Sequence, residues 1–489
     1  MSLTTTKTVS SYIAGAWVDT PGAEIHQTFD PGRLGEAVAS YSLATADDVQ
    51  LAIDSARESA PAWATTSASE RMDLVYALLE KWPSRQKDMA EIATREMGKA
   101  YSESFGETTR AIFEMRFWAG EALRGGDQTF TSVRRNTDAY TIRQPIGPVA
   151  AITPWNFPIL TPIRKVIPAL ICGCPVILKP ALQSPGATAI LAEMLDDIGV
   201  PVGVFNLLIG TGRNVGNALV ESPDIAGITF TGSTDVGLRI AVGAARRNAK
   251  VQLEMGGKNA AVVASLADVD AAAAEIATAA FTAAGQRCTA ISRVIVVEEL
   301  RAKLEEALVR HAAAFSVGYG LEDGTRMGPL VNESQFEDVR RYVDEAREND
   351  GATVLIGGKP VADESVGEGY YYPATVVTDV KPGSPLAVEE VFGPVLALIT
   401  VADFDEAIRV TNETRYGLTA AVFTDDMSLA HRFVTESRTG MVHVNHGTTS
   451  EGHVPFGGTA QSGQGAFGIG ATSRDFFTSR KAVYQTFTQ

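Results

Sequence analysis

The first quarter of the chain repeats its apolar residues at helical spacing. Within residues 46–124, Leu74 and Leu78 fall on one face of an amphipathic pattern whose other face is polar. Thr45 stands just before this region and is a suitable N-cap for its first helix. We therefore expect amphipathic helices here, ending at the two glycines of 125–126.

From Ile146 onward the pattern changes to short apolar runs that alternate with helical stretches. The runs are 147–152, 175–178, 203–208, 227–230, 260–263, 294–297 and 395–399. Strand–helix alternation predicts an α/β fold with parallel sheets, doubly wound in its first part and followed by a second α/β domain. Residues 128–145 alternate like strands, and the tail after Gly468 returns to helix and strand.

The overall composition is that of a globular enzyme. At 489 residues the chain exceeds one compact core, so we expect two or three domains. The net charge of −16 argues against a nucleic-acid-binding surface. The most apolar stretch, 166–178, is interrupted by Pro168, Gly173 and Pro175, which argues against a membrane span. With no secretory signal visible, we expect a cytoplasmic protein without nucleic-acid or membrane partners.

The cysteines and histidines give no sign of a metal site. Three cysteines in this length fit a reducing compartment without a disulfide framework. Cys172 and Cys174 are too close for a Cys-x-x-Cys site, and we expect both in the core. His443 and His446 are three residues apart in a strand-like segment, so their side chains should point to opposite faces.

Cys288 is the residue whose surroundings suggest chemistry. It follows an Ala-rich helical stretch and stands beside Gly285 and the cationic Arg287. A thiolate nucleophile needs a lowered pKa or a base. Glu254, at another strand end, can serve as that base or activate water. These residues alone leave two interpretations open, covalent catalysis and a buried structural thiol.

Five motifs in a fixed order distinguish the two interpretations. They are 153–158 (TPWNFP), 230–233 (FTGS), 253–258 (LEMGGK), 285–288 (GQRC) and 389–394 (EEVFGP). Together they closely resemble the NAD(P)-dependent aldehyde dehydrogenase superfamily, over nearly the whole chain from about Ile13 to 481–484. One Gly-rich match alone would carry little weight.

The resemblance implies a Rossmann-type nucleotide-binding domain, a second α/β catalytic domain and a small β oligomerisation arm. We assign residues 1–127 and 146–251 to the first, 252–455 to the second, and 128–145 with 456–489 to the arm and C-terminal tail. The arm and the strand near Val483 resemble family segments that pair across subunits. We therefore expect a homo-oligomer, either a dimer or a tetramer.

The resemblance also implies NAD or NADP as the cofactor. The strand, turn and helix start around 230–233 can present backbone N–H groups to a phosphate, although an ordinary turn would have the same pattern. In the family match Ser233 contacts the pyrophosphate, Lys179 the adenosine ribose and Glu390 the nicotinamide ribose. The implied cofactor residues are Ile152, Thr153, Pro154, Trp155, Lys179, Gly212, Gly216, Phe230, Thr231, Gly232, Ser233, Glu390 and Phe392.

Leu182 bears on the choice of nucleotide. NAD-preferring members commonly carry a Glu three residues after the lysine that matches Lys179, and here that position is Leu182. A carboxylate would repel a 2′-phosphate, whereas leucine does not. We expect dual specificity or a preference for NADP.

The implied catalytic set is Cys288, Glu254 and Asn156. Asn156 lies in a rigid, proline-flanked segment. Its side-chain amide, together with the Cys288 N–H, would stabilise an oxyanion. The structural alternative is that the Asn156 side chain only forms an Asx-turn. The resulting thiohemiacetal would pass a hydride to the nicotinamide, and Glu254 would activate water to release the acid. Acyl-CoA-forming relatives typically lack this Glu, so its presence favours a free carboxylic acid.

The substrate is expected to be a semialdehyde acid. Arg164 matches a carboxylate-binding arginine of succinate semialdehyde dehydrogenases, with helix packing as the equal alternative; the second arginine of that clamp falls at Thr282. The segments around Cys288 and 451–458 look more like the 2-oxoglutarate semialdehyde dehydrogenase-like branch. The candidate substrate residues are Arg164, Phe157, Arg287 and Phe456. An aromatic aldehyde of the benzaldehyde or vanillin type is the alternative substrate, and a non-catalytic scaffold is the alternative function.

Overall fold

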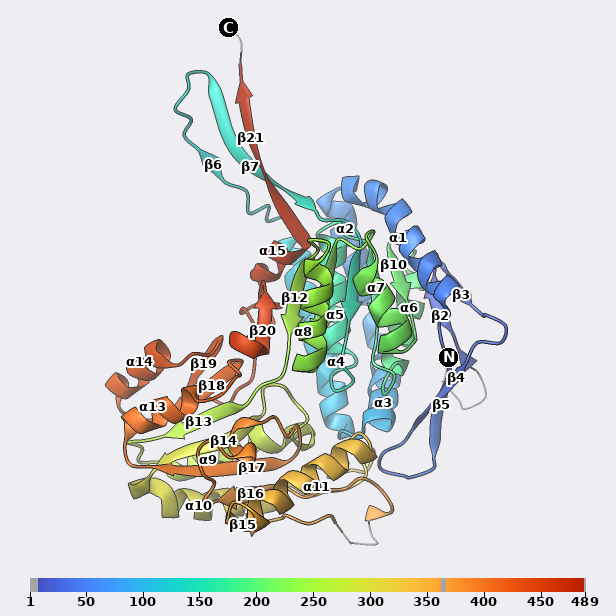
Figure 1. Ribbon diagram of the computed structural model, residues 1–489. Coiled ribbons are helices and arrows are strands. Elements are labelled where there is room, and N and C mark those ends of the chain that lie inside the picture. Colours follow the sequence, from blue (N-terminus) through green and yellow to red (C-terminus); the bar gives the residue numbers. More distant parts are fainter. Residues whose placement is uncertain (1–7, 362–365, 488–489) are drawn as a thin grey trace.

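The computed structural model describes residues 8–361 and 366–487, which form two large helix-flanked sheets, a small sheet and a projecting arm (Figure 1). The outermost residues of the expected first domain and tail lie outside these ranges. We propose that the domains follow the residue ranges given above. Within the described ranges, no helix is both long and apolar enough to cross a membrane.

The first large sheet has eight strands in the order β20-β12-β11-β8-β9-β10-β2-β3. Their bounds are β2 (Ser11–Ile13), β3 (Ala16–Val18), β8 (Val149–Ile152), β9 (Val176–Lys179), β10 (Phe205–Leu207), β11 (Gly227–Thr231), β12 (Lys250–Glu254) and β20 (Gly463–Gly465). The run from β12 to β10 is parallel and mostly buried, as continuous apolar strands covered on both faces should be. The four apolar runs expected in this region are confirmed as strands.

The order of the parallel strands reverses beside β8. This strand pairs with β9, the next strand in the chain, and with β11, the third strand after β8. At the carboxyl ends, Ile152 therefore lies opposite both Lys179 and Phe230. Doubly wound sheets bind their ligands at such a reversal, so the topology places a binding site here.

Helices surround this sheet. Their bounds are α1 (Ala46–Thr65), α2 (Ala68–Lys81), η1 (Trp82–Ser84), α3 (Gln86–Met97), α4 (Tyr101–Glu121), α5 (Leu160–Ile171), α6 (Gly186–Asp197), η2 (Gly212–Gly216), α7 (Asn217–Glu221) and α8 (Thr234–Ala245). Thr45 caps α1 as expected, because its hydroxyl accepts the Asp48 N–H while the Asp48 carboxylate accepts the Thr45 N–H. The long helix α4 packs against both α3 and α5.

The second large sheet has seven strands in the order β15-β16-β17-β14-β13-β18-β19. Its strands are β13 (Asn259–Val263), β14 (Ile291–Val297), β15 (Thr353–Ile356), β16 (Thr375–Thr378), β17 (Val395–Val401), β18 (Thr419–Phe423) and β19 (Met441–Val444). The accompanying helices are α9 (Val269–Phe281), η3 (Thr282–Gly285), α10 (Glu298–Ala313), α11 (Glu333–Glu348), α12 (Pro385–Val388), α13 (Phe404–Asn412) and α14 (Met427–Glu436). Only β15 pairs antiparallel in this sheet, at its edge. The expected α/β fold class is confirmed.

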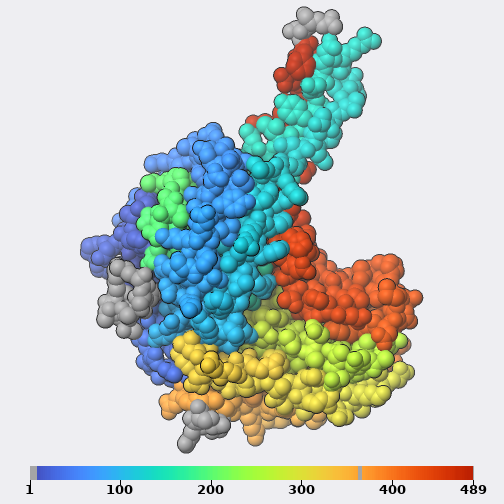
Figure 2. Space-filling model, turned by 180° about the vertical axis from the view of Figure 1, so that it is seen from behind, coloured from blue at the N-terminus to red at the C-terminus, as the bar shows by residue number. Residues whose placement is uncertain are grey.

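The arm is a three-stranded sheet that projects from the body (Figures 1 and 2). Its strands are β6 (Thr129–Phe130), β7 (Thr137–Pro145) and β21 (Thr478–Thr486), and the short helices η5 (Ala460–Ser462), η6 (Ala471–Ser473) and α15 (Arg474–Phe477) precede β21. A small sheet of β1 (Thr8–Val9), β4 (Ile25–Phe29) and β5 (Ala37–Ser42) lies near the N-terminus. Residues 463–465, expected in the tail, form β20 and join the first large sheet.

The prediction that His443 and His446 point to opposite faces is wrong. Their rings stack with centroids 5.4 Å apart and an interplanar angle of 12°. The strand β19 ends at Val444, and Asn445 has a φ of 50°. The chain therefore leaves the extended conformation before His446, and the alternation of strand side chains no longer applies.

Candidate active site

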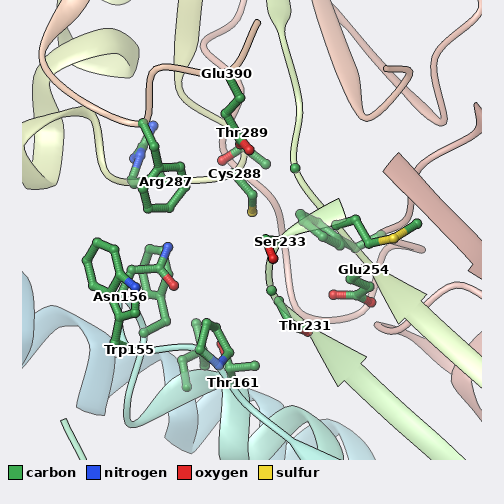
Figure 3. A pocket seen from close by; sticks show the side chains of 18 of the residues that line it. Trp155, Asn156, Thr161, Thr231, Ser233, Glu254, Arg287, Cys288, Thr289 and Glu390 are labelled. Atoms are coloured by element: carbon green, nitrogen blue, oxygen red, sulfur yellow. The ribbon is translucent and has the colours of Figure 1, made fainter. Parts of the chain in front are cut away.

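A cavity of ≈ 360 Å³ lies where the carboxyl ends of β8, β11 and β12 face the segment that follows η3. This volume is typical of small-molecule sites. All five sequence motifs contribute to its lining, through Trp155, Ser233, Glu254, Cys288 and Phe392. Figure 3 shows these motifs converging, with the Cys288 sulfur pointing into the space between Asn156 and Glu254.

A left-handed turn delivers Cys288 to the cavity. Ala283, Ala284 and Gly285 have φ values of 56°, 53° and 68°. A side chain at Gly285 is excluded, because its Cβ would lie 2.1 Å from the Gly393 carbonyl oxygen. Alanine in this conformation is strained, so contacts must hold the turn. One of them comes from α4, where the Glu103 carboxylate accepts the Ala283 N–H at 2.8 Å.

Cys288 is held as a thiol at neutral pH. Burial, together with the carboxylates of Glu254 and Glu390, raises the pKa of Cys288 to about 12. The guanidinium groups of Arg164 and Arg287 act in the opposite direction. A nucleophilic role therefore requires a proton acceptor nearby.

Glu254 can provide such an acceptor. It is buried at the end of β12, and its Oε1 has no hydrogen-bond partner among the described residues. Burial raises the pKa of Glu254, while Lys165 and Arg164 partly oppose that rise. A carboxylate with a raised pKa is a stronger base. Gly468 leaves room for it, since a Cβ there would lie 1.5 Å from Glu254 Oε1.

Asn156 is fixed with an amide N–H directed across the cavity wall. Its Nδ2 donates to the Gln286 carbonyl oxygen at 2.9 Å, which ties the 153–158 segment to the turn before Cys288. Its backbone carbonyl accepts from the buried Lys99 at 3.2 Å. An amide nitrogen carries two donors, so one remains for an oxyanion.

The residues around β11 fit a nucleotide phosphate. The strand ends at Thr231, and α8 begins at Thr234 with Ser233 as its N-cap. The Ser233 hydroxyl makes no capping bond, and the buried Thr231 hydroxyl has no partner in the described structure. A helix N-terminus with free hydroxyl donors is a favourable place for an anion.

Lys179 fits the adenosine side of the same ligand. It is buried at the end of β9, and its Nζ donates to the adjacent Pro180 carbonyl. Burial lowers the pKa of Lys179 to about 8, because the charged form has lost its solvation. Hydroxyl or phosphate acceptors on a bound nucleotide would restore that solvation.

Several expected cofactor residues do not line the cavity itself: Ile152, Thr153, Lys179, Gly212, Gly216 and Phe230. The side chains of Ile152 and Phe230 belong to the apolar core beneath the sheet edge. Gly212 and Gly216 bound a short π-helical turn capped by Thr211. These residues surround the carboxyl ends of β8 to β11 rather than the thiol, as an extended dinucleotide requires.

Glu390 and Phe392 lie on the opposite wall from the first sheet. The Glu390 carboxylate accepts the Gly257 N–H at 3.0 Å, and burial raises its pKa to about 7. The Phe392 ring contacts Trp155 edge-on, with centroids 5.5 Å apart. Gln335 holds this segment by donating to the Val391 and Phe392 carbonyls.

The expected substrate residues Phe157, Arg164, Arg287 and Phe456 all line the cavity. Arg164, however, already has a carboxylate partner. Its Nε and Nη2 lie 2.8 Å and 2.7 Å from Oε1 of the buried Glu114. Arg287 donates to the Ala279 carbonyl at 3.0 Å.

Sequence reasoning missed the contribution of α4, and from α5 it expected only Arg164. Arg110, Leu160, Thr161 and Lys165 line the cavity, although α4 was interpreted only as an amphipathic helix. Lys165 is buried and donates to the Thr229 hydroxyl at 2.8 Å. Charged residues at helical spacing inside an otherwise apolar pattern were the available signal.

Comparisons with known proteins agree with this geometry. The aldehyde dehydrogenase family pattern matches residues 17–483. The alpha-ketoglutaric semialdehyde dehydrogenase of Bacillus subtilis (strain 168) is 36% identical over 483 residues, which cover 99% of each chain.

Two solved structures superimpose closely. Betaine aldehyde dehydrogenase from Staphylococcus aureus, in complex with NAD+, has a TM-score of 0.94 at 29% identity, over 98% of this chain and 95% of that one. An NADP dependent enzyme from E. coli has a TM-score of 0.94 at 33% identity, over 98% of both chains. The chain belongs to the aldehyde dehydrogenase family and is an NAD(P)-dependent aldehyde dehydrogenase.

Proposed function

We propose that this enzyme oxidises an ω-oxo carboxylic acid, that is, a semialdehyde acid, to the corresponding dicarboxylic acid. The observation that carries the proposal is that four guanidinium groups, those of Arg110, Arg164, Arg287 and Arg341, line the cavity that holds Cys288. In a chain with a net charge of −16, such a local concentration of cations favours an anionic ligand. The Bacillus subtilis relative is named for a substrate of this class.

The proposed chemistry begins at Cys288. Its thiolate attacks the aldehyde carbon, a C–S bond forms, and the carbonyl electron pair moves to oxygen, where the Asn156 amide donates a hydrogen bond. A bound NAD(P) supplies the acceptor for the hydride that leaves this carbon. Glu254 then takes a proton from water, whose oxygen attacks the thioester as the C–S bond breaks. The product is a free carboxylic acid.

The proposed nucleotide preference is dual or toward NADP. Leu182 is half-buried against the core, and its carbonyl oxygen lies 3.0 Å from His26 Nε2. This position offers no carboxylate that would repel a 2′-phosphate. The Staphylococcus aureus structure contains NAD+, and the E. coli relative is described as NADP dependent, so the family fold accepts both.

Steady-state kinetics on a substrate panel tests the proposal. The panel comprises succinate semialdehyde, 2-oxoglutarate semialdehyde, benzaldehyde and a short aliphatic aldehyde, each with NAD and NADP. We expect kcat/KM for the semialdehyde acids to exceed that for neutral aldehydes by about 100-fold, the difference that one or two charge-assisted hydrogen bonds provide. Higher kcat/KM for benzaldehyde would instead support an aromatic substrate held between Phe157 and Phe456.

The nucleotide arms of the same panel test the cofactor proposal independently. Dual use or an NADP preference is expected. A preference for NAD above about 100-fold, or roughly 2.7 kcal/mol, would show that Leu182 does not set the selectivity.

We further propose a homo-oligomer, a dimer or tetramer assembled through the arm, in the cytoplasm. The arm supports assembly because its outer strands β6 and β21 have unpaired edges. The three cysteines are all free, in keeping with a reducing compartment.

A further inference from the structure

Helix α4 presents a row of four charged side chains along one face. Glu103, Glu107, Arg110 and Glu114 follow one another at intervals of four, three and four residues, the spacing of neighbours on a helix surface. Three of the four are acidic, and Arg110 is the only base in the row. The partners of each member show what remains free to bind a ligand.

The first two carboxylates hold backbone segments of the active site. Glu103 accepts the Ala283 N–H in the turn before Cys288. Glu107 forms a buried ion pair with Lys99, and its Oε1 accepts two N–H groups at the start of α5, at 2.8 Å and 2.6 Å. Both oxygens of Glu107 are therefore occupied, and this residue does not pair with Arg110 one turn away.

The third carboxylate, Glu114, is committed to Arg164 through its Oε1. Glu114 is almost fully buried, with a side-chain exposure of 2%. A substrate carboxylate that approached Arg164 would meet this negative charge, and like charges in a poorly solvated site repel strongly. Arg164 is thus ion-paired within the protein, although Arg164 Nη2 and Glu114 Oε2 lack a hydrogen-bond partner among the described residues.

Arg110 has no such partner. It makes two contacts, from Nη2 to the carbonyl oxygen of Ser450 at 3.2 Å and to the Ser450 hydroxyl at 3.4 Å. Within residues 8–361 and 366–487, no carboxylate lies within 4.0 Å of its guanidinium. Burial and the neighbouring Arg164 lower the pKa of Arg110 to about 10, although the more distant carboxylates of Glu114 and Glu107 oppose that shift, and Arg110 stays charged at neutral pH. A half-buried cation that lines a cavity without a fixed anion is suited to an anionic ligand.

We propose that Arg110, together with the Ser450 hydroxyl, binds the carboxylate of the substrate, and that Arg164 is a positioning residue held by Glu114. A guanidinium matches a carboxylate through two parallel hydrogen bonds, and a serine hydroxyl beside it can donate a third. The assignment replaces Arg164 as the carboxylate anchor. It rests on the proposed function, because it presumes an ω-oxo acid substrate.

The test compares Arg110→Met, Arg164→Met and Arg116→Met. Arg116 is an exposed arginine on the same helix, so its replacement removes the same charge without touching the cavity. The substrates are 5-oxopentanoate and its methyl ester, which differ in the charge that Arg110 is proposed to bind. Turnover of the neutral ester reports whether each variant is folded and competent.

We expect Arg110→Met to raise KM for 5-oxopentanoate by about 30-fold or more, while KM for the ester changes less than about threefold. Arg110→Lys, which keeps the charge but not the two parallel bonds, should fall between wild type and Arg110→Met. Arg164→Met should change KM for the acid and for the ester to the same extent, because a positioning residue does not contact the charge of the substrate. Arg116→Met should match wild type.

A binding measurement provides a second readout. Glutarate should protect Cys288 from alkylation by iodoacetamide in the wild-type enzyme and in Arg116→Met, without nucleotide, but not in Arg110→Met. The assignment would be overturned if Arg164→Met raised KM for 5-oxopentanoate but not for the ester, while Arg110→Met left both KM values unchanged. If both the wild-type enzyme and Arg110→Met prefer the acid to the ester, the assignment of Arg110 is wrong but the proposed function still holds. A wild-type enzyme with no preference overturns the proposed function as well.

Discussion

Glu254 acts on the Cys288 thiol through its charge as well as through its basicity. The carboxylate raises the thiol pKa, second only to burial, so it disfavours the thiolate in the absence of ligands. Two roles for Glu254 lead to opposite expectations. If it deprotonates the thiol, its removal slows every reaction of Cys288; if it activates water, its removal leaves the thiol more reactive.

We predict that the Cys288 thiol is alkylated faster in Glu254→Gln than in the wild-type enzyme. A thiol with a raised pKa is protonated below that pKa, and its thiolate fraction grows tenfold for each unit of pH or of pKa lowering. Removing the adjacent negative charge should therefore increase the rate of iodoacetamide labelling at pH 7–9 by about 3- to 10-fold. Aldehyde turnover should fall by about 100-fold or more, because deacylation loses its base.

Labelling followed by mass spectrometry over this pH range, without nucleotide, measures the first effect. Cys288→Ala is the control, and it should show neither labelling at this site nor turnover. Slower labelling of Glu254→Gln at every pH would identify Glu254 as the base for the thiol instead.

At the scale of elements, side chains of α4 and of the residues just before it bind several active-site segments. The Lys99–Glu107 ion pair is buried, with side-chain exposures of 2% and 1%. Glu107 caps the start of α5, and Lys99 supports the Asn156 carbonyl. Removing one partner leaves an uncompensated buried charge, whereas removing both does not.

We predict that Glu107→Gln destabilises the protein by about 3–5 kcal/mol, and that the double variant Glu107→Gln with Lys99→Met is more stable than Glu107→Gln alone. Thermal unfolding of the single and double variants checks this order. The surface pair Lys81–Asp197 provides the matched control, and Asp197→Asn should cost less than about 1 kcal/mol. A double variant less stable than either single change would show that the pair contributes net stability.

At the scale of the whole molecule, the arm carries several strongly exposed apolar side chains. Phe130 and Val133 lie in or near β6, and Tyr484 lies in β21, with exposures of 52%, 103% and 76%. The arm stands away from the body (Figure 2), so no other described part of the chain covers these side chains. Unpaired edges with exposed apolar groups are stable when a second chain covers them.

We predict that the wild-type protein is a dimer or tetramer at micromolar concentration, and that Tyr484→Lys shifts it toward smaller species. Light scattering coupled to size-exclusion chromatography measures both. Met427→Lys, at an equally exposed apolar residue on α14, should leave the mass unchanged. A monomeric wild type, or identical masses for Tyr484→Lys and wild type, would contradict assembly through the arm.

The sequence by itself determined the features that depend on local pattern. Continuous apolar runs predicted the inner parallel strands, because a strand that is buried on both faces is apolar at successive positions. Ordered motifs gave Asn156, Glu254 and Cys288, which the structure brings to one cavity. Asn156 follows β8 and Glu254 ends β12, two parallel strands of one sheet whose carboxyl ends share an edge, so their proximity follows from topology. Cys288, in contrast, reaches the cavity from the turn before β14 of the second sheet.

Only the tertiary structure decided which charges pair. Helical spacing places Glu103, Glu107, Arg110 and Glu114 on one face of α4, but it does not say that this face meets α5 and the loop of Ser450. The contact between Arg164 and Glu114, fifty residues apart in sequence, depends on how α4 packs against α5. The stacking of His443 and His446 likewise depends on one positive φ at Asn445. Such pairings are set by how elements pack, and packing is a property of the whole fold rather than of any segment.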